Sequence, residues 1–347
     1  MSSPRIHTRV VLTSLFAGAL VAGMFAACAE QPERSAGPSL QQPSSLTAAM
    51  RVQERYTPDL LDKPGIVGTA VGIGNDGRPT VVVMTRAPGV TGIPATLEGT
   101  RVEVRVTGEF RALSLAVQAG TNLKGQIRPV PNGASVGNNN ECSAGTLGAA
   151  VVKGGNQYVL SNNHVLARQN AAATGEDIVQ PGRYDNKPKC ANEVATDQIA
   201  DLSDFQAIVF STSANNTMDA AIAQATTTLT CSTPAGFYGS PSAEVAPPAV
   251  GLPIQKVGRT SRLTTGTITA INATVNVGYS VGTARFVGQI VTSRGQSKSG
   301  DSGSLFVTND GTNRPVGLLF AGTSDGTTIA NPIGLVLSRF GATICQG

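Results

Sequence analysis

The segment Gly300-Asp301-Ser302-Gly303 has the composition of a nucleophilic turn. Glycines on both sides of Ser302 permit a tight turn that can point backbone amides at an atom under attack. The apolar residues 305–307 predict a strand that leaves this turn. A serine hydroxyl is a weak nucleophile and needs a base, most often a histidine. The positions of the histidines therefore decide whether Ser302 can react.

The chain contains two histidines, and His7 lies in an N-terminal segment that has the features of an export signal. His164 is then the one histidine that can serve Ser302. It follows the apolar residues 158–160 and the polar residues 161–163, which places it at the end of a strand. A lone histidine is more often a hydrogen-bonded surface residue. The serine turn in the same chain reverses that preference and favours a catalytic base.

A histidine base needs a carboxylate to fix its tautomer. The aspartates considered between the histidine and the serine are Asp177, Asp185, Asp197, Asp201, Asp204 and Asp219. Asp219 is followed directly by the small apolar residues 220–223, which is typical of a carboxylate that enters a core. The other five lie among polar or turn-forming residues. We therefore predict a triad of His164, Asp219 and Ser302.

The order of these residues along the chain excludes two classes of hydrolase. An α/β-hydrolase needs a histidine after the serine, and no histidine follows Ser302. Its nucleophile elbow also needs a glycine where Ser304 stands. The subtilisin order places the acid before the histidine, whereas the order histidine, aspartate, serine is that of chymotrypsin.

Residues 161–164, 219–223 and 300–303 resemble the three signature blocks of bacterial chymotrypsin-like (trypsin-fold) serine proteases. The resemblance extends over roughly residues 133–347. It implies a mainly β fold with two antiparallel six-stranded barrels, and hydrolysis of peptide bonds through an acyl-enzyme. It also implies an oxyanion hole formed by the backbone amides of Gly300 and Ser302. The asparagines at 162 and 163 and the cysteine positions depart from the family pattern, which leaves the substrate range and the disulfides open.

The resemblance also implies a cation for Asp301, which is buried in this family and would be costly without a partner. Arg259 lies in a segment similar to the one from which bacterial relatives supply an arginine, so we predict an Arg259–Asp301 ion pair. The expected specificity pocket contains Gln296, Ala321 and Gly322. Gln296 stands where trypsins carry an acid, so we expect small or apolar substrate side chains rather than Lys or Arg.

Composition agrees with a mainly β fold. The 347 residues include 40 glycines and no tryptophan, and short apolar runs recur from residue 142 onward, which favours many short strands. The predicted secondary-structure elements include a strand at 206–210 and a last helix at 332–342. Four cysteines after residue 28, Cys142, Cys190, Cys231 and Cys345, predict two disulfides with three possible connectivities.

The N-terminal region divides into three parts. Residues 1–28 combine Arg5 and Arg9 with an apolar run and predict an export signal. Cys28 resembles the lipidated cysteine of a bacterial lipobox, with ordinary signal cleavage as the alternative, so the protein is expected in the cell envelope or secreted. Residues 29–46 predict a disordered linker.

Residues 47–110 predict a small α+β unit that precedes the protease domain. A helix is expected at 46–61, a strand pair at 65–73 and 80–85, a helical turn at 93–98 and a strand at 101–106. The unit is either a removable pro-region or a permanent accessory domain. The second is favoured because no cleavage site is evident. Residues 111–132 are expected to connect it to the protease domain at 133–347.

The sequence therefore predicts an exported serine endopeptidase that acts on protein or peptide substrates. The formal net charge of +4 is not gathered in a basic cluster, so nucleic acid is not an expected partner. No metal or other cofactor is expected, and membrane attachment is expected only through Cys28. The oligomeric state is not predicted. The alternatives are a non-catalytic binding or scaffold protein of the same fold, and an esterase that uses the same triad.

Overall fold

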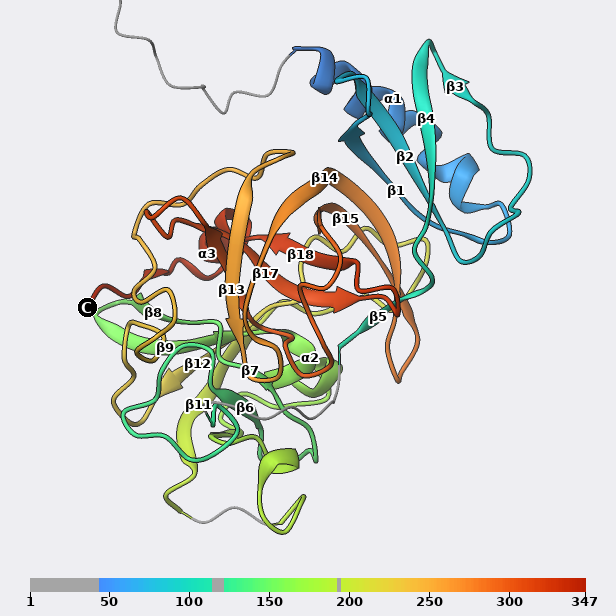
Figure 1. Ribbon diagram of the computed structural model, residues 1–347. Helices are drawn as coiled ribbons and strands as arrows, with labels where there is room; N and C mark the ends of the chain where they lie inside the picture. The colour runs from blue at the N-terminus through green and yellow to red at the C-terminus, as the bar shows by residue number, and fades with distance from the viewer. Residues whose placement is uncertain (1–43, 114–121, 192–194) are drawn as a thin grey trace, which may run out of the picture. The chain divides into compact units, whose positions relative to one another are not determined.

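The computed structural model describes residues 44–113, 122–191 and 195–347 (Figure 1). The predicted export signal, Cys28 and linker residues 29–43 lie outside the described residues. Strands dominate the rest of the chain, which confirms the predicted mainly β class. Within the described ranges, no helix is both long and apolar enough to cross a membrane.

The first barrel forms from an eight-stranded sheet in the order β19-β8-β9-β12-β11-β10-β6-β7. Its strands are β6 (Ser135–Asn138), β7 (Gly145–Thr146), β8 (Ala149–Lys153), β9 (Asn156–Ser161), β10 (Asp177–Val179), β11 (Gln198–Phe205), β12 (Ala221–Ala225) and β19 (Thr343–Ile344). β7 runs into β8 after two residues, so the two act as one interrupted strand and the ring closes on six positions. Val159, Ile178 and Leu202 are among the residues that fill its core.

The second barrel is a closed ring of six antiparallel strands. They are β13 (Pro253–Gly258), β14 (Arg262–Gly278), β15 (Thr283–Thr292), β16 (Leu305–Thr308), β17 (Pro315–Gly322) and β18 (Thr328–Pro332). The sheet order is β13-β16-β17-β18-β15-β14, and pairing of β13 with β14 closes it. The helix α3 (Ile333–Phe340) follows, as predicted, and packs with strands of both barrels through Val336 and Phe340.

The N-terminal unit consists of the helix α1 and four strands. These are α1 (Ser44–Leu61), β1 (Ile66–Ile73), β2 (Pro79–Thr85), β3 (Thr96–Leu97) and β4 (Thr100–Val106). The helical turn predicted at 93–98 is wrong, because this region contributes β3, which pairs with β4. Leu60, Val81 and Val83 form a separate small core beneath α1.

This unit is joined to the second barrel by main-chain pairing. β1 runs antiparallel to β14, with Gly68 opposite Val275 and Gly72 opposite Ala270. A Cβ atom on Gly68 would lie 2.8 Å from Val275 Cγ1, so the close approach requires glycine. The four N-terminal strands therefore extend the sheet of the second barrel.

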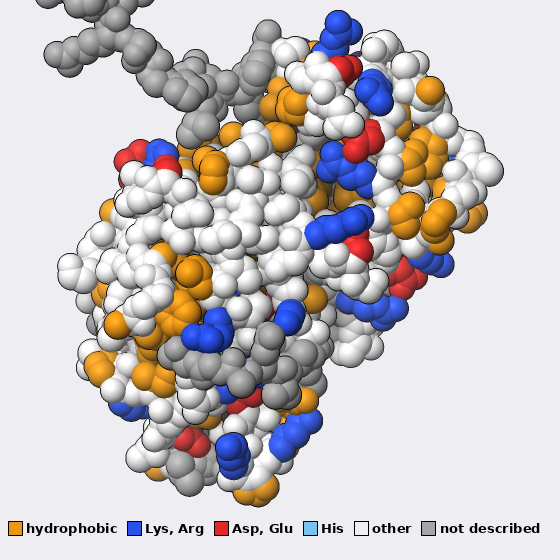
Figure 2. All heavy atoms as spheres, viewed as in Figure 1, with side chains coloured by type: hydrophobic (Ala, Val, Ile, Leu, Met, Phe, Trp, Pro, Cys, Tyr) orange, Lys and Arg blue, Asp and Glu red, His pale blue; other side chains and the backbone are white. Residues whose placement is uncertain are grey.

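Charged side chains of both signs lie side by side over the N-terminal unit (Figure 2). They include the surface ion pairs Arg55–Glu98 and Arg86–Glu109. Because these pairs are exposed to solvent, they contribute little to stability.

Two further features lie outside the predicted pattern. The strand β5 (Phe110–Ala112) falls at the start of the region predicted as a connector, and it pairs with β14 and β17. The strand predicted at 206–210 is wrong. There the amides of Ile208 and Val209 donate to the side chains of Asn170 and Asn216 instead of to a neighbouring strand.

The four cysteines form two disulfides, as their even number predicts. Cys142 pairs with Cys190, and Cys231 pairs with Cys345. One of the three possible connectivities is thereby selected. The second bridge ties the C-terminus to the segment that follows β12.

Candidate active site

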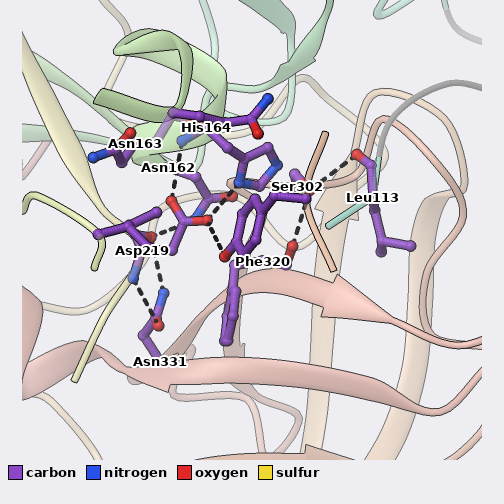
Figure 3. A network of polar contacts seen from close by, with 12 residues as sticks. Leu113, Asn162, Asn163, His164, Asp219, Ser302, Phe320 and Asn331 are labelled. Atoms are coloured by element: carbon purple, nitrogen blue, oxygen red, sulfur yellow. Dashed lines mark hydrogen bonds and ion pairs between the residues drawn. The ribbon is translucent and has the colours of Figure 1, made fainter. Parts of the chain in front are cut away.

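His164 and Asp219 lie together on the rim of the first barrel. His164 belongs to the short helix α2 (Asn163–Leu166), which follows β9, and Asp219 lies just before β12. The imidazole Nδ1 is 2.6 Å from Asp219 Oδ2, and the His164 amide donates to Oδ1 at 3.1 Å. Asp219 is fully buried and His164 is nearly so. The carboxylate therefore fixes both the ring and the backbone that carries it (Figure 3).

The Asp219 carboxylate has a second side-chain partner, Tyr279. The Tyr279 hydroxyl donates to Oδ2 at 2.9 Å, and the Tyr279 ring meets the imidazole edge to face at 6.0 Å between centroids. Burial, together with the neighbouring Asp219 carboxylate, raises the pKa of Tyr279 well above its ordinary value. The phenol therefore stays protonated and can donate to Asp219 throughout the neutral range.

Two asparagines hold the backbone of Asp219. The side-chain amides of Asn162 and Asn331 donate to the Asp219 carbonyl at 2.7 and 3.0 Å, and Asn331 Oδ1 accepts from the Asp219 amide. Asn162 thus has a role in this chain, although the family pattern has a small residue there.

Ser302 lies in the predicted tight turn just before β16. Gly300 and Gly303, on either side of it, have φ values of +93° and +92°, a conformation that other residues rarely adopt. The Ser302 carbonyl accepts from the Thr146 amide at 2.8 Å, and the Gly303 amide donates to Leu319 at 2.8 Å. The turn is therefore held by strands of both barrels, and Ser302 lies in the interface between them.

The Ser302 hydroxyl donates to two carbonyl oxygens in this structure. The acceptors are Leu113 at 3.0 Å and Phe320 at 3.3 Å (Figure 3). His164 Nε2 is buried and makes no hydrogen bond within the described residues. The Ser302 hydroxyl and His164 Nε2 are therefore not hydrogen-bonded to each other in this structure, and catalytic hydrogen bonds of this kind commonly form only in the substrate complex.

The amide of Gly300, one of the two predicted oxyanion-hole donors, already makes a hydrogen bond within the chain. It donates to the carbonyl oxygen of Leu113 at 3.2 Å. The same oxygen accepts from the Ser302 hydroxyl, so the carbonyl of Leu113 lies between that hydroxyl and the Gly300 amide. The role of the Ser302 amide remains a prediction.

The predicted ion pair between Arg259 and Asp301 is wrong. Asp301 is fully buried and its Oδ2 lies 3.4 Å from Nζ of Lys256, which is also fully buried. Oδ1 accepts from the amides of Thr260 and Ser261, and Oδ2 accepts from the amide of Lys298. Burial alone would raise the pKa of Asp301, but the Lys256 ammonium and these hydrogen bonds outweigh it and hold the pKa below its ordinary value.

Arg259 pairs instead with Asp185, in a bidentate contact with both distances 2.8 Å. Its guanidinium also lies against the turn at residues 300–303, because a Cβ atom on Gly300 would stand 2.1 Å from Nη1. The physical reason is strand periodicity. Lys256 and Gly258 share the face of β13 that meets Asp301, so the next side chain, Arg259, points away from it.

The three residues predicted for the specificity pocket lie in two places. Ala321 and Gly322 end β17 and pair with β5. Gln296 is buried, and its Nε2 donates to the carbonyls of Thr265 and Arg294. Its Oε1 is buried without a hydrogen bond among the described residues. Gln296 thus presents a neutral group, not a carboxylate.

A pocket of about 390 Å³ adjoins the site. Its lining includes His164, Val165, Tyr279 and Leu113. Within the described ranges, no group of three or more His, Cys, Asp or Glu side chains is arranged to hold a metal ion.

Sequence reasoning missed Tyr279, Lys256 and the approach of Leu113 to the serine. Lys256 carried a usable signal, because a lysine between Ile254 and Val257 in a buried strand needs a buried acid. Tyr279 lies at the turn between β14 and β15, and Leu113 lies in a region without clear periodicity. Neither residue therefore has a recognisable signal in the sequence.

Comparison with known proteins gives one family match. The model of the lysyl endopeptidase C-terminal domain matches residues 119–332, more than half of the chain. A search of curated proteins gives no significant match.

Three of the solved structures that are similar to the chain are proteases. A glutamic-acid-specific serine protease that utilizes a histidine triad in substrate binding is 22% identical, with a TM-score of 0.44, over 62% of this chain and 100% of that one. The Nocardiopsis protease is 19% identical, with a TM-score of 0.45, over 62% and 99% of the two chains. Thermobifida fusca protease A is 21% identical, with a TM-score of 0.43, over 63% and 99%.

Proposed function

The chain belongs to the family of the lysyl endopeptidase C-terminal domain, and from this premise we propose that it is an exported serine endopeptidase with a His164–Asp219–Ser302 triad. As a family member it is a serine protease of trypsin fold. The observation that carries the finer assignment is the buried contact of 2.6 Å between His164 Nδ1 and Asp219 Oδ2, in a chain that also holds Ser302 in a glycine-flanked turn at the interface of the two barrels.

In the proposed mechanism, Ser302 Oγ attacks the carbonyl carbon of the substrate and its proton passes to His164 Nε2. Asp219 stabilises the imidazolium that forms, and Tyr279 holds the carboxylate from its other side. The amides of Gly300 and Ser302 stabilise the oxyanion. His164 then donates its proton to the leaving amine, and water hydrolyses the acyl-enzyme by the reverse proton route.

The proposal does not extend to the lysine preference in the family name. Gln296 offers no negative charge to a substrate ammonium, and burial of an unpaired charge is costly. We therefore propose an apolar preference at the residue before the scissile bond.

A fluorophosphonate probe tests the nucleophile. We expect labelling of folded wild-type protein at Ser302, and strong loss of labelling in Ser302→Ala and His164→Ala. The reaction is followed over hours because the carbonyl of Leu113 lies at the hydroxyl. An unlabelled Ser302, beside a labelled reference protease, would leave the rival hypothesis of a non-catalytic scaffold. Matched ester and peptide substrates separate an endopeptidase from an esterase.

Export is part of the proposal. The two disulfides support an oxidising compartment. Fractionation of a bacterial host that expresses the whole chain tests export. Labelling with a fatty-acid analogue, with Cys28→Ser as the control, decides between a lipid anchor and secretion.

A further inference from the structure

The strand β5 lies along β17 in the manner of a bound peptide. Ala112 pairs with Ala321 and Arg111 with Gly322, in antiparallel register. On its other side β5 runs parallel to the end of β14. Extended peptides often bind proteins by adding a strand to a sheet in this way. The two β17 residues are those predicted to line the substrate cleft.

The next residue, Leu113, presents its carbonyl group to the catalytic turn. The carbonyl oxygen accepts from the Gly300 amide at 3.2 Å and from the Ser302 hydroxyl at 3.0 Å. A carbonyl held between the nucleophile and an oxyanion-hole amide has the placement of a group about to be attacked.

The side chain of Leu113 is held in apolar surroundings. Its two δ-carbons lie 3.2 and 3.3 Å from the place that a Cβ atom on Gly322 would take, so a glycine at 322 makes room for them. The side chain is partly buried against a cluster that includes Leu319 and Ala330. These contacts suit an aliphatic side chain better than a charged one.

We propose, on the basis of the proposed serine protease function, that the chain is its own first substrate and that the bond after Leu113 is cleaved. The same contacts make leucine the preferred residue before the scissile bond, with alanine preceding it. The unit that contains α1 and β1–β5 is then a pro-region rather than a permanent accessory domain. Its last three residues, 111–113, occupy the substrate cleft.

The reaction balances without a co-reactant other than water. Ser302 Oγ forms a bond to the carbonyl carbon of Leu113, and His164 takes the hydroxyl proton. The bond to the nitrogen of Ser114 breaks, and that amine leaves with the proton from His164. Water then releases the Leu113 carboxylate and restores Ser302. The pocket of about 390 Å³ beside Leu113 and His164 gives space on the side from which the water must come.

Mass spectrometry of the whole expressed chain tests the cleavage position. We expect the wild type to yield an N-terminal fragment that ends at Leu113 and a second fragment that begins at Ser114. Ser302→Ala and His164→Ala should keep this bond intact, which excludes cleavage by host proteases.

A matched pair of substitutions tests the role of the leucine side chain. Leu113→Asp should slow the cleavage at least about tenfold, whereas Leu113→Met, which keeps the volume, should leave it nearly unchanged. Leu335→Asp is the control, since Leu335 is an exposed leucine outside the cleft. Equal cleavage of Leu113→Asp and Leu335→Asp would overturn the proposal.

Synthetic substrates give a measurement that does not depend on how the variants fold. With chromogenic peptides that end in Ala-Leu, Ala-Lys or Ala-Val, wild-type kcat/KM should be at least about tenfold higher for leucine than for lysine. A preference for lysine, or an intact 113–114 bond in protein that labels at Ser302 and digests peptides, would refute the self-cleavage proposal and leave the protease function standing. Protein that neither labels nor cleaves any substrate would refute both.

Discussion

Asp219 and Asp301 are two fully buried carboxylates that differ in the charge of their partners. Asp219 contacts the imidazole of His164 and the phenol of Tyr279, and neither group is a permanent cation. Asp301 faces the buried ammonium of Lys256 and accepts hydrogen bonds from three backbone amides. In the proposed mechanism, the first environment leaves the Asp219 carboxylate able to stabilise a positive charge that appears only during the reaction. The second environment balances the charge of the Asp301 carboxylate permanently with the ammonium of Lys256.

The difference indicates a division of labour between two acids that share the same interface. A group that must respond to a transient imidazolium cannot be neutralised in advance by a fixed cation. A group that holds the shape of the turn at residues 300–303 is stabilised by such a cation, because an unpaired buried charge is costly. We therefore expect substitutions at Asp219 to lower the reaction rate, and substitutions at Asp301 or its partner to lower the stability of the fold.

The largest expected effect is that of Asp219→Asn on rate. The amide keeps the shape of the side chain but cannot stabilise the imidazolium, so kcat should fall by about 10⁴-fold. Thermal unfolding should change little by comparison. Steady-state kinetics with the peptide substrates and a melting curve measure the two quantities. A variant that retained most of its activity would remove Asp219 from the mechanism.

Lys256→Met should destabilise the fold by about 3–5 kcal/mol, since it leaves Asp301 buried without a cation. The double variant Lys256→Met/Asp301→Asn should recover part of the loss, because the unpaired charge is gone. Lys187→Met, at an exposed lysine, is the control and should stay within about 0.5 kcal/mol of wild type. Chemical denaturation measures all three. Equal stability of Lys256→Met and the control would show that the ion pair has no structural role.

The same comparison shows what the sequence can and cannot predict. Ser302 was identifiable from its glycines and His164 from the count of histidines, because both signals are local. The twofold strand period could have separated Lys256 from Arg259, but the choice of Arg259 followed family resemblance. The two barrels were predictable from recurrent short strands. The pairing of β1 with β14 was not, since it depends on contacts between distant segments.

Contacts over long sequence separations account for the rest. Tyr279 meets Asp219 across 60 positions, and Leu113 meets Ser302 across 189. No periodicity or motif marks either residue, because its partner is defined only by the fold. The predicted connector at 111–132 had an irregular composition for the same reason. Its first two residues, Arg111 and Ala112, pair with β17, a strand far along the chain.

Tyr279→Phe should have an intermediate effect on rate. The hydrogen bond to a carboxylate contributes roughly 1.5–3 kcal/mol, so kcat/KM should fall about tenfold to a hundredfold if the bond acts fully in the transition state. Loss of the donor leaves the Asp219 carboxylate, and with it the His164 ring, less firmly oriented, so the fall should appear in kcat while the melting temperature changes no more than in the control. Steady-state kinetics and melting curves measure the two quantities, and a lower melting temperature with an unchanged kcat would mean a merely structural role. Tyr158→Phe, which removes a hydroxyl bonded to Gln224, is the control.

The smallest effect concerns acid stability. The folded-state pKa of Asp301 lies below its ordinary value, so its stabilising contribution is complete above the unfolded-state pKa of about 4. It is lost as the pH falls through the lower folded-state pKa, where the folded protein takes up the proton. Asp301→Asn should therefore be less stable than wild type at pH 7, and the gap should narrow as the pH falls below about 4. Melting temperatures between pH 7 and pH 2 measure this, and a constant gap would mean that Asp301 does not titrate with unfolding.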